Sequence, residues 1–320
     1  MKRALLIGIN YPGTAHALRG CVNDVTSMTS VLKTNFGFSD RDITLIVDNQ
    51  ATTANMKNAL EKFVSKVAPG DTLYFHYSGH GSQVYDESNP DFEPDGLDEI
   101  IVPVDIDWDT KIIRDDELKT IFDKVPNGVN LTVVLDCCNS GGGIDQANQY
   151  QPLGVARGGK DDNSKGLGRY LPPPAHVTQI IIEKQRTRNI SLKPRALQRN
   201  VDTTGLMISG CQAHQTSADA FIGGKYMGAC TYYLQEVLRQ TQYSVDYKTL
   251  VDMMNNKLAT AGYTQRPELN GPTLLFSKKF LQSYISGGSV TQTRLKRERP
   301  KKTPWWRRIL ERVFPKSCCK

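Results

Sequence analysis

Residues 72–81, Thr-Leu-Tyr-Phe-His-Tyr-Ser-Gly-His-Gly, decide the fold more than any other stretch of the chain. Six β-prone residues run into a glycine-flanked loop that carries His80, which predicts a strand ending in an uncovered imidazole. Residues 131–143, Leu-Thr-Val-Val-Leu-Asp-Cys-Cys-Asn-Ser-Gly-Gly-Gly, repeat this arrangement, with an apolar strand that leads to Cys138 and a run of glycines. The two stretches therefore predict strands of one sheet whose ends carry a histidine and a cysteine.

Strand and helix patterns alternate around these two stretches in the first half of the chain. Helical spacing of apolar residues separates short β-rich runs, which is typical of an α/β fold with a mostly parallel sheet and helices on both faces. Functional groups of such sheets gather beyond the carboxyl ends of the strands, where His80 and Cys138 are expected. The expected elements are strands Ala4–Ile9, Ile43–Val47, Thr72–Tyr77 and Leu131–Leu135, and helices Cys21–Phe36 and Thr53–Val67.

The second half begins with a long irregular stretch. Residues 146–204 are dominated by Gly, Pro, Asn, Lys and Arg and contain only a brief apolar run, Gln179–Ile182, which predicts a linker. The sheet is then expected to continue. We predict one domain over residues 1–281, in blocks 1–145 and 205–281 around the linker, followed by a basic tail, residues 282–320. The later elements are expected at Leu206–Ser209, Met227–Arg239, Tyr247–Ala261 and Pro272–Phe276, of which the second and third are helices.

Composition limits the class of protein. The 320 residues are 39% hydrophobic and 23% charged, which is ordinary for a globular protein, and no apolar run reaches the length of a membrane span. The apolar start of the chain stops at Asn10 without a cleavage site for a signal peptidase. Seven cysteines, with no CxxC pair, favour free thiols over a disulfide framework or a zinc site. We therefore expect a cytoplasmic protein with reduced cysteines.

The net charge of +7 is concentrated at one end of the chain. Residues 294–320 carry eleven Lys and Arg against two Glu, so the tail has a charge of +9 and the remainder −2. This distribution argues against specific nucleic-acid binding by the whole protein. Residues 305–314, Trp-Trp-Arg-Arg-Ile-Leu-Glu-Arg-Val-Phe, fit a short basic amphipathic helix on an anionic membrane surface, and Cys318 and Cys319 are candidates for acylation. A disordered tail is the alternative, and nucleic-acid attraction is the weaker one.

Histidine and cysteine at neighbouring strand ends predict nucleophilic catalysis. The imidazole of His80 can hold the thiol proton or stabilise a thiolate at Cys138, and a thiol at a strand end is expected to be better exposed than a buried one. Residues 141–143 offer backbone N–H groups to a developing oxyanion. Taken singly, His80 reads as a loop histidine without a task and Cys138 as an inert buried thiol. Together they favour a Cys-His dyad.

At this level of detail the chain resembles the metacaspases, within the caspase-like clan of cysteine peptidases. The shared motifs are Ser-Gly-His-Gly at 78–81, Asp-Cys-Cys at 136–138, Gly-Cys-Val-Asn-Asp at 20–24, Asp-Gly-Leu-Asp-Glu at 95–99, Asp-Asp-Glu-Leu at 115–118, Ile-Ser-Gly-Cys at 208–211 and Gln-Thr-Ser-Ala-Asp at 215–219. They span residues 1–281 apart from the linker. One departure is Asn139, where members of the family commonly have histidine.

The resemblance implies a role for each motif residue. Cys138 is the nucleophile and His80 the general acid/base, whereas Cys137 stands where the family tolerates Ser or Cys. The residues that match the substrate pocket are Cys21, Asp24, Ser78 and Asp136. Two of these are acidic, and carboxylates grip a cationic side chain, which implies polypeptide substrates cut after Arg or Lys. The alternative is that Asp24 caps a helix and Asp136 ends a strand as a solvated charge.

The resemblance also implies regulation by calcium and a monomeric state. Asp95, Asp115, Asp116 and Asp145 match calcium-binding positions of related metacaspases, and a plain solvated acidic loop is the alternative. The linker is a candidate for self-cleavage because it offers several cations to the predicted pocket. These are Lys160, Lys165, Arg169, Lys184, Arg186 and Arg188.

Two other functions are compatible with these motifs. A catalytically weak caspase-like scaffold, anchored by the basic tail, would keep the fold, and Asn139 beside the nucleophile leaves room for it. A relative of the same clan with another specificity is the second alternative, which the acidic pocket disfavours.

Overall fold

A six-stranded sheet forms the centre of the computed structural model, which describes residues 1–87, 96–138, 155–156, 166–187, 205–212 and 215–282. Five strands are parallel, and the last strand pairs antiparallel at one edge. The sheet joins both blocks of the sequence, which confirms the predicted α/β fold. Its order is β13 (Glu268–Asn270), β10 (Leu206–Ser209), β7 (Asn130–Asp136), β3 (Thr72–Ser78), β1 (Lys2–Gly8) and β2 (Ile43–Val47).

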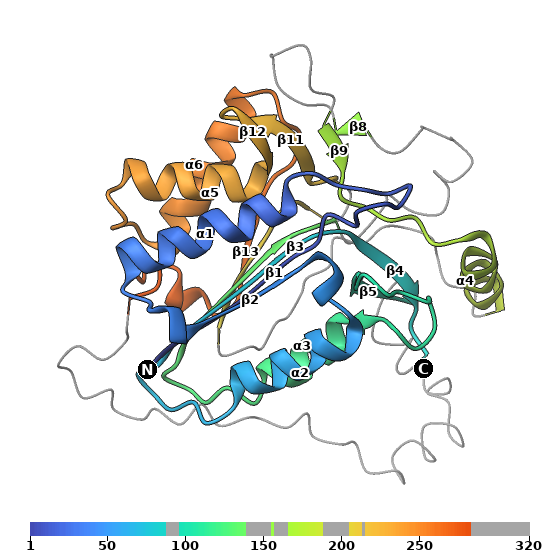
Figure 1. Ribbon diagram of the computed structural model, residues 1–320, viewed down its shortest axis with the longest axis horizontal. Coiled ribbons are helices and arrows are strands. Elements are labelled where there is room, and N and C mark those ends of the chain that lie inside the picture. Colours follow the sequence, from blue (N-terminus) through green and yellow to red (C-terminus); the bar gives the residue numbers. More distant parts are fainter. Residues whose placement is uncertain (88–95, 139–154, 157–165, 188–204, 213–214, 283–320) are drawn as a thin grey trace, which may run out of the picture. The chain divides into compact units, whose positions relative to one another are not determined.

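Helices cover both faces of this sheet (Figure 1). On one face lie α2 (Thr53–Val64) and α3 (Asp115–Phe122), and on the other α1 (Cys21–Phe36), α5 (Ala229–Gln240) and α6 (Tyr247–Thr260). Side chains of β1 alternate between the two apolar clusters that result, because successive residues of a strand point to opposite faces. A strand buried on both faces reads as the continuous apolar run seen in the sequence.

The register of β3 and β7 positions the site. Tyr77 lies opposite Leu135 and Ser78 opposite Asp136 in this parallel pair, so both strands end at the same edge. His80 and Cys138 leave the sheet there, each two residues beyond its strand. All the described elements belong to one compact unit, Met1–Tyr284, whereas the predicted division into two blocks and a linker stays a prediction.

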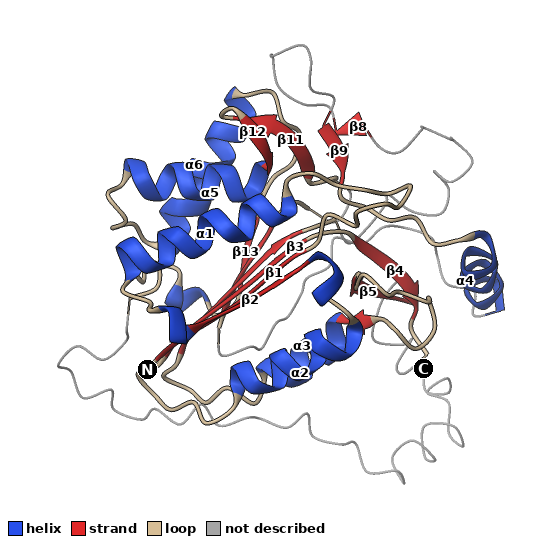
Figure 2. Ribbon diagram, in the orientation of Figure 1, coloured by secondary structure: helices blue, strands red, loops and turns tan. Residues whose placement is uncertain are grey.

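Two small antiparallel sheets flank this edge (Figure 2). Neither was predicted, because their strands are short and several of them hold polar residues. The first contains β4 (Gly81–Tyr85), β5 (Leu97–Ile101) and β6 (Ile113–Arg114). The second contains β12 (Lys225–Gly228), β11 (Ala218–Ile222), β9 (Gly166–Gly168) and β8 (Val155–Ala156).

Part of the predicted linker is ordered secondary structure. Helix α4 (Ala175–Thr187) buries Val177 and Ile181 against Tyr85 and Leu97 of the first small sheet. Its apolar stripe is narrow, with few apolar residues among many polar ones, so the sequence pattern was too weak to predict a helix. Strand β9 also lies within the linker.

Two other expectations were wrong in detail. The predicted last strand, Pro272–Phe276, contains only a 3-10 turn, Thr273–Leu275, and Leu274 is 67% exposed, so its apolar residues are not a sheet face. The edge strand is instead β13. The helix expected from Met227 begins at Ala229, because Met227 pairs in β12. Further 3-10 turns lie at Asp40–Asp42 and Asp48–Gln50.

No helix in the described part of the chain has the length and apolar character needed to cross a membrane. The five cysteines in that part, Cys21, Cys137, Cys138, Cys211 and Cys230, carry free thiols, as predicted. Cys318 and Cys319 lie outside the described residues, as does the basic tail from residue 283 onward.

Candidate active site

His80 is held in one orientation between β3 and β4. Its Nε2 lies 2.7 Å from the carbonyl oxygen of His16, and because a carbonyl only accepts, Nε2 donates this hydrogen bond. The other ring nitrogen, Nδ1, has no hydrogen-bond partner within the described residues and is therefore the basic atom. Burial lowers the pKa of His80 to about 4, despite the opposing effect of the His16 carbonyl. The imidazole is neutral at pH 7 and able to accept a proton.

Cys138 is fully buried, contrary to the expectation of an exposed thiol. Its Sγ accepts the backbone N–H of Ser217, 2.7 Å away, at the start of the chain segment that leads to β11. The difference has a physical cause, because a segment of the chain's own predicted linker crosses the site (Figure 1).

Residues 166–171 cross the site as an extended chain. Strand β9 pairs antiparallel with β11, Gly168 opposite Ala218, and the N–H of Arg169 donates to the carbonyl of Ser217 at 3.1 Å. Beyond Arg169 the chain changes partner, and Leu171 donates its N–H to the carbonyl of Gly81 at 2.9 Å. Arg169 therefore lies at the junction between the two flanking sheets.

The carbonyl oxygen of Arg169 accepts two backbone N–H groups. Gly81 donates at 2.9 Å and Cys138 at 3.4 Å, so the donors adjoin or belong to the two predicted catalytic residues. Two N–H groups that converge on one carbonyl oxygen are the arrangement that stabilises an oxyanion. From the sequence, the N–H groups of residues 141–143 were predicted to stabilise the oxyanion, and these residues lie outside the described ones.

The side chain of Arg169 fills the pocket that the acidic residues form. Its guanidinium is fully buried, with Nη1 2.7 Å from Ser78 Oγ and 3.2 Å from Asp136 Oδ1. Nη2 lies 2.8 Å from Asp24 Oδ2 and 3.0 Å from Asp219 Oδ1. Three predicted pocket residues are thus brought together on one cation, and Asp219 joins them.

Cys21, the fourth predicted pocket residue, is the first residue of α1 and is completely buried beside this group. Burial raises its pKa well above the ordinary value, although the nearby positive charge of Arg169 opposes this. The thiol is therefore neutral and contributes bulk to the pocket wall, without a charge.

Helix N-termini hold two of the carboxylates. The N–H and hydroxyl of Thr231, in the first turn of α5, donate to Asp136 Oδ2 at 2.9 and 2.7 Å. The N–H groups of Arg19 and Gly20, just before α1, donate to the two oxygens of Asp219 at 2.8 and 2.9 Å. The N–H groups at a helix start lack partners within the helix and favour an anion, so these contacts stabilise carboxylates at buried positions.

Three carboxylates surround one guanidinium, and the pKa values of Asp136 and Asp24 shift in opposite directions. Burial acts to raise the pKa of Asp136, but Arg169 and the hydroxyls of Ser217 and Thr231 outweigh it and lower the pKa. For Asp24, burial prevails over Arg169 and raises the pKa to about 7. Both acids are fully buried, which rules out the alternative that Asp136 is a solvated charge at a strand end.

Gly228 closes the pocket on the side of α5. A Cβ at this position would fall on the carboxylate of Asp136 and 2.5 Å from Nη1 of Arg169. Its N–H donates to Asp24 Oδ1 at 2.9 Å. Any side chain here would occupy the space that the guanidinium needs.

The predicted calcium ligands are only partly within the described residues. Asp115 and Asp116 open α3, whereas Asp95 and Asp145 lie outside. No group of three or more His, Cys, Asp or Glu within the described ranges is placed to hold a metal ion. Asp86 and Asp116 nevertheless lie close enough to Asp98 to interact with it. Burial, followed by the charges of Asp86 and Asp116, raises the pKa of Asp98 to about 6.

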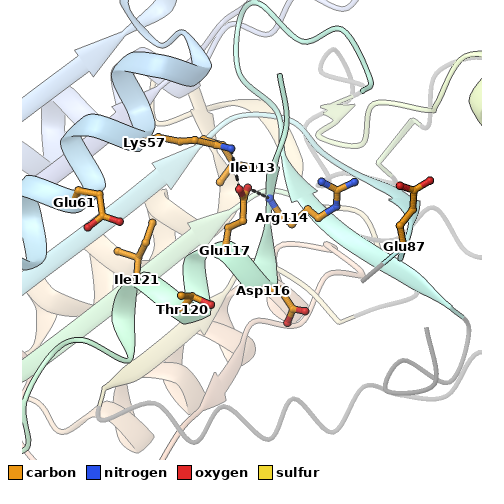
Figure 3. Close-up of a pocket in the computed structure, with 9 residues that line it drawn as sticks. All are labelled: Lys57, Glu61, Glu87, Ile113, Arg114, Asp116, Glu117, Thr120 and Ile121. Carbon is orange, nitrogen blue, oxygen red and sulfur yellow. Dashed lines mark hydrogen bonds and ion pairs between the residues drawn. The ribbon is translucent and has the colours of Figure 1, made fainter. Parts of the chain in front are cut away.

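A hollow of about 700 Å³ adjoins these acids (Figure 3). Arg114 lines it and forms an ion pair with Asp98, with Nε 2.7 Å from Oδ2, and Lys57 pairs with Glu117 at 2.9 Å. The residues that line the hollow are Lys57, Glu61, Glu87, Ile113, Arg114, Asp116, Glu117, Thr120 and Ile121.

Two residues of the acidic pocket, Asp219 and Arg169, were not predicted to lie there from the sequence. Asp219 belongs to the motif at 215–219, where its acidity was a usable signal, but nothing local shows that it faces Asp24. Arg169 was one of six linker cations, and its short neighbours Gly166 and Gly168 are the only local sign of a chain that fits a narrow groove.

Comparisons with known proteins identify the family of the chain. The sequence profile described as "Metacaspase, peptidase C14 domain" matches residues 2–147. Metacaspase-1A of Aspergillus fumigatus is 34% identical over 285 residues, covering 84% of this chain and 68% of the relative. Metacaspase-1 of Kluyveromyces lactis is 33% identical over 296 residues, covering 84% and 65%. The chain thus spans about two thirds of the length of these curated relatives.

Two solved structures share the fold. The protein GSU0716 from Geobacter sulfurreducens superposes with a TM-score of 0.61 at 26% identity, over 88% of this chain and 98% of that one. Caspase-1 from Spodoptera frugiperda superposes with a TM-score of 0.50 at 14% identity, over 84% and 86%, which supports the fold alone. These matches show that the chain belongs to the metacaspases, and that it is a cysteine-type endopeptidase with a caspase-like fold.

Proposed function

We propose that this metacaspase cuts polypeptides after arginine, with Cys138 as nucleophile and His80 as general acid/base, and that its first substrate is its own Arg169–Tyr170 bond. The observation that supports this is the placement of Arg169. Its guanidinium lies among Asp24, Asp136 and Asp219, and its carbonyl oxygen accepts the N–H groups of Gly81 and Cys138.

The proposed reaction begins with transfer of the Cys138 thiol proton to Nδ1 of His80. The thiolate sulfur then bonds to the carbonyl carbon of Arg169, and the oxygen becomes an oxyanion held by the two backbone N–H groups. As the peptide C–N bond breaks, His80 returns the proton to the amine of Tyr170. Water hydrolyses the thioester, which leaves residue 169 as a carboxylate and restores the thiol.

The pocket favours arginine over lysine. Two guanidinium nitrogens, Nη1 and Nη2, contact different acceptors, Ser78 and Asp136 on one side and Asp24 and Asp219 on the other. A single ammonium cannot occupy both positions, whereas the planar fork of arginine can. We expect kcat/KM for an arginine peptide to exceed that for the matched lysine peptide about tenfold or more.

The self-cleavage is tested with the purified full-length chain incubated with calcium. Mass spectrometry should find a fragment that begins at Tyr170 in the wild type and none in Cys138→Ala or Arg169→Ala. Arg186→Ala is the matched control, because Arg186 is an exposed linker cation on α4, and it should be cut like the wild type. Cleavage only at other linker residues would contradict the proposal. An intact wild type that also turns over no arginine or aspartate peptide would favour a catalytically weak scaffold.

We also propose calcium as the activator. The support for this is the negative charge that Asp86, Asp98 and Asp116 bring together, since hard cations prefer carboxylate oxygens, while the ligand set would need residues beyond the described ones. Arg114 offsets some of this charge at Asp98. Titration calorimetry with calcium should give a binding isotherm that weakens in Asp116→Asn, while no binding would refute this part of the proposal.

Three properties of the protein stay predictions. We propose that the basic tail binds anionic membrane surfaces, that the protein is a monomer and that it works in the cytoplasm. Sedimentation with phosphatidylserine vesicles should retain the full chain but not a chain that ends at residue 282, and analytical ultracentrifugation tests the monomer.

A further inference from the structure

The chain beyond the proposed scissile bond is bound by a different element from the chain before it. Strand β4 pairs with residues 170 and 171 in parallel, with Gly81 opposite Tyr170. The carbonyl of Gly81 accepts the N–H of Leu171 at 2.9 Å, and the hydroxyl of Ser82 donates to the carbonyl of Leu171 at 2.5 Å. Both backbone polar groups of Leu171 are thus satisfied by two consecutive residues of β4.

The side chain of Leu171 enters an apolar surface. It is 7% exposed and belongs to the same buried cluster as Val84 of β4 and Ile101 of β5. Tyr170, one residue earlier, is partly exposed. Burial of apolar area is the main source of affinity at such a contact, so the second residue after the cut contributes more selectivity than the first.

The binding stops after this residue. Residues 172–174 are three prolines, which have no N–H to donate and cannot continue a strand pairing. The described contacts on β4 therefore define a site for two residues.

We propose that Gly81 and Ser82 form a binding site for the second residue after the cut, the Ser82 subsite, which selects protein substrates with a large apolar side chain at that position. In this assignment Gly81 and Ser82 hold the backbone of that residue, and the apolar surface of β4 and β5 selects its side chain. The side chain of Ser82 is fully buried, and its hydroxyl contacts the carbonyl of Leu171 and the side chain of Tyr170, so it binds both residues after the cut. This inference rests on the proposed function, because it treats residues 166–171 as a bound substrate.

Substrate variants test the subsite without altering the enzyme. Two internally quenched peptides carry Gly-Leu-Gly-Arg-Tyr-Leu or Gly-Leu-Gly-Arg-Tyr-Glu, and a third has N-methyl-leucine at the last position. A short substrate, Gly-Leu-Gly-Arg-aminocoumarin, has no residue in the subsite. We expect kcat/KM to be about tenfold higher for the Leu peptide than for the Glu peptide, because burying the leucine contributes binding that glutamate cannot. N-methylation removes the N–H that donates to the carbonyl of Gly81, and it should lower kcat/KM about fivefold or more relative to the Leu peptide.

The Ser82→Ala variant tests the residue itself. The ratio of kcat/KM on the Leu peptide to that on the short substrate should fall about fivefold, since one hydrogen bond to the extended peptide is lost. The N-methyl peptide keeps the test valid if this variant does not fold.

The outcomes separate the two proposals. If the wild type cleaves none of the four substrates, the proposed function itself fails, and the subsite with it. If the short substrate is cleaved but the Leu, Glu and N-methyl peptides agree within twofold, the proposed function stands and the subsite is overturned.

Discussion

The acidic pocket around Arg169 and the acidic group beside α3 both hold buried aspartates, but they balance the charge differently. In the pocket, helix starts and one guanidinium satisfy Asp24, Asp136 and Asp219, all of them within 2% of full burial. Beside α3, Asp98 is equally buried and pairs with Arg114, and burial and the charges of Asp86 and Asp116 still raise its pKa. A set of acids shaped for one fork selects a side chain, whereas a set with excess charge attracts a small cation.

The largest test of this difference is Asp136→Asn. Loss of one partner of a buried ion pair costs about 2–5 kcal/mol, so kcat/KM on an arginine peptide should fall about 30-fold or more. Asp40→Asn is the matched control, because Asp40 is an aspartate whose side chain is 86% exposed, and it should retain the wild-type rate. Similar losses in both variants would show that the pocket acids have no special role.

Gly228→Ala tests the shape of the pocket without changing its charge. The added methyl group occupies space beside Asp136 and the guanidinium, so we expect the KM for arginine peptides to rise about tenfold or more, with a smaller effect on kcat. Thermal unfolding distinguishes this from a general loss of stability. An unchanged KM in a folded variant would contradict the conclusion that Gly228 lines the arginine pocket.

The pH dependence of binding distinguishes the two acidic regions. The pKa of Asp24 is about 7 with Arg169 in place, and removing that cation raises it further, so binding of a guanidinium or amidine releases a proton. Affinity for benzamidine should therefore fall as the pH drops towards 7, by at most about tenfold per pH unit, and become constant below 7. It should be measured by inhibition of the cleaved enzyme. Calcium affinity should instead fall near pH 6, where Asp98 gains its proton.

The smallest expected effect is that of Asp116→Asn on calcium. Loss of one carboxylate should weaken calcium binding about three- to tenfold in calorimetry. Benzamidine affinity of the cleaved variant at saturating calcium checks the separation of the two regions. A loss of benzamidine affinity as large as that of calcium would mean that the regions are not independent.

Most of the central sheet could be predicted from the sequence, and the flanking sheets could not. Cys21–Phe36 and Ile43–Val47 were predicted at their observed limits, because buried helices and strands carry strong periodic patterns. Strand β9 has only three residues, two of them glycine, and exists because β11 provides its partners. Helix α4 likewise depends on the apolar surface of β4 and β5. Such elements follow from tertiary contacts and leave little local pattern.

The site followed the same division. The motif residues Asp24, Ser78 and Asp136 were predicted together from the resemblance. Ser78 and Asp136 end strands of the central sheet, and Asp24 lies in the first turn of α1. Asp219 lies in β11 and Arg169 follows β9, two strands that the pattern missed. The two N–H groups that meet the carbonyl of Arg169 were not predicted, because a backbone N–H has no signature in the sequence and depends only on how the chain turns.

The burial of Arg169 has a consequence for how activity would start. A segment of the same chain competes for the pocket at an effective concentration that is of millimolar order for a short tether, far above that of most protein substrates. A separate substrate would rarely displace it before the first cut. The onset of proteolysis would then follow a first-order delay that does not depend on how much enzyme is present. Dilution would leave that delay unchanged, and the cell would time this protease by a process within each molecule, not by encounters between molecules.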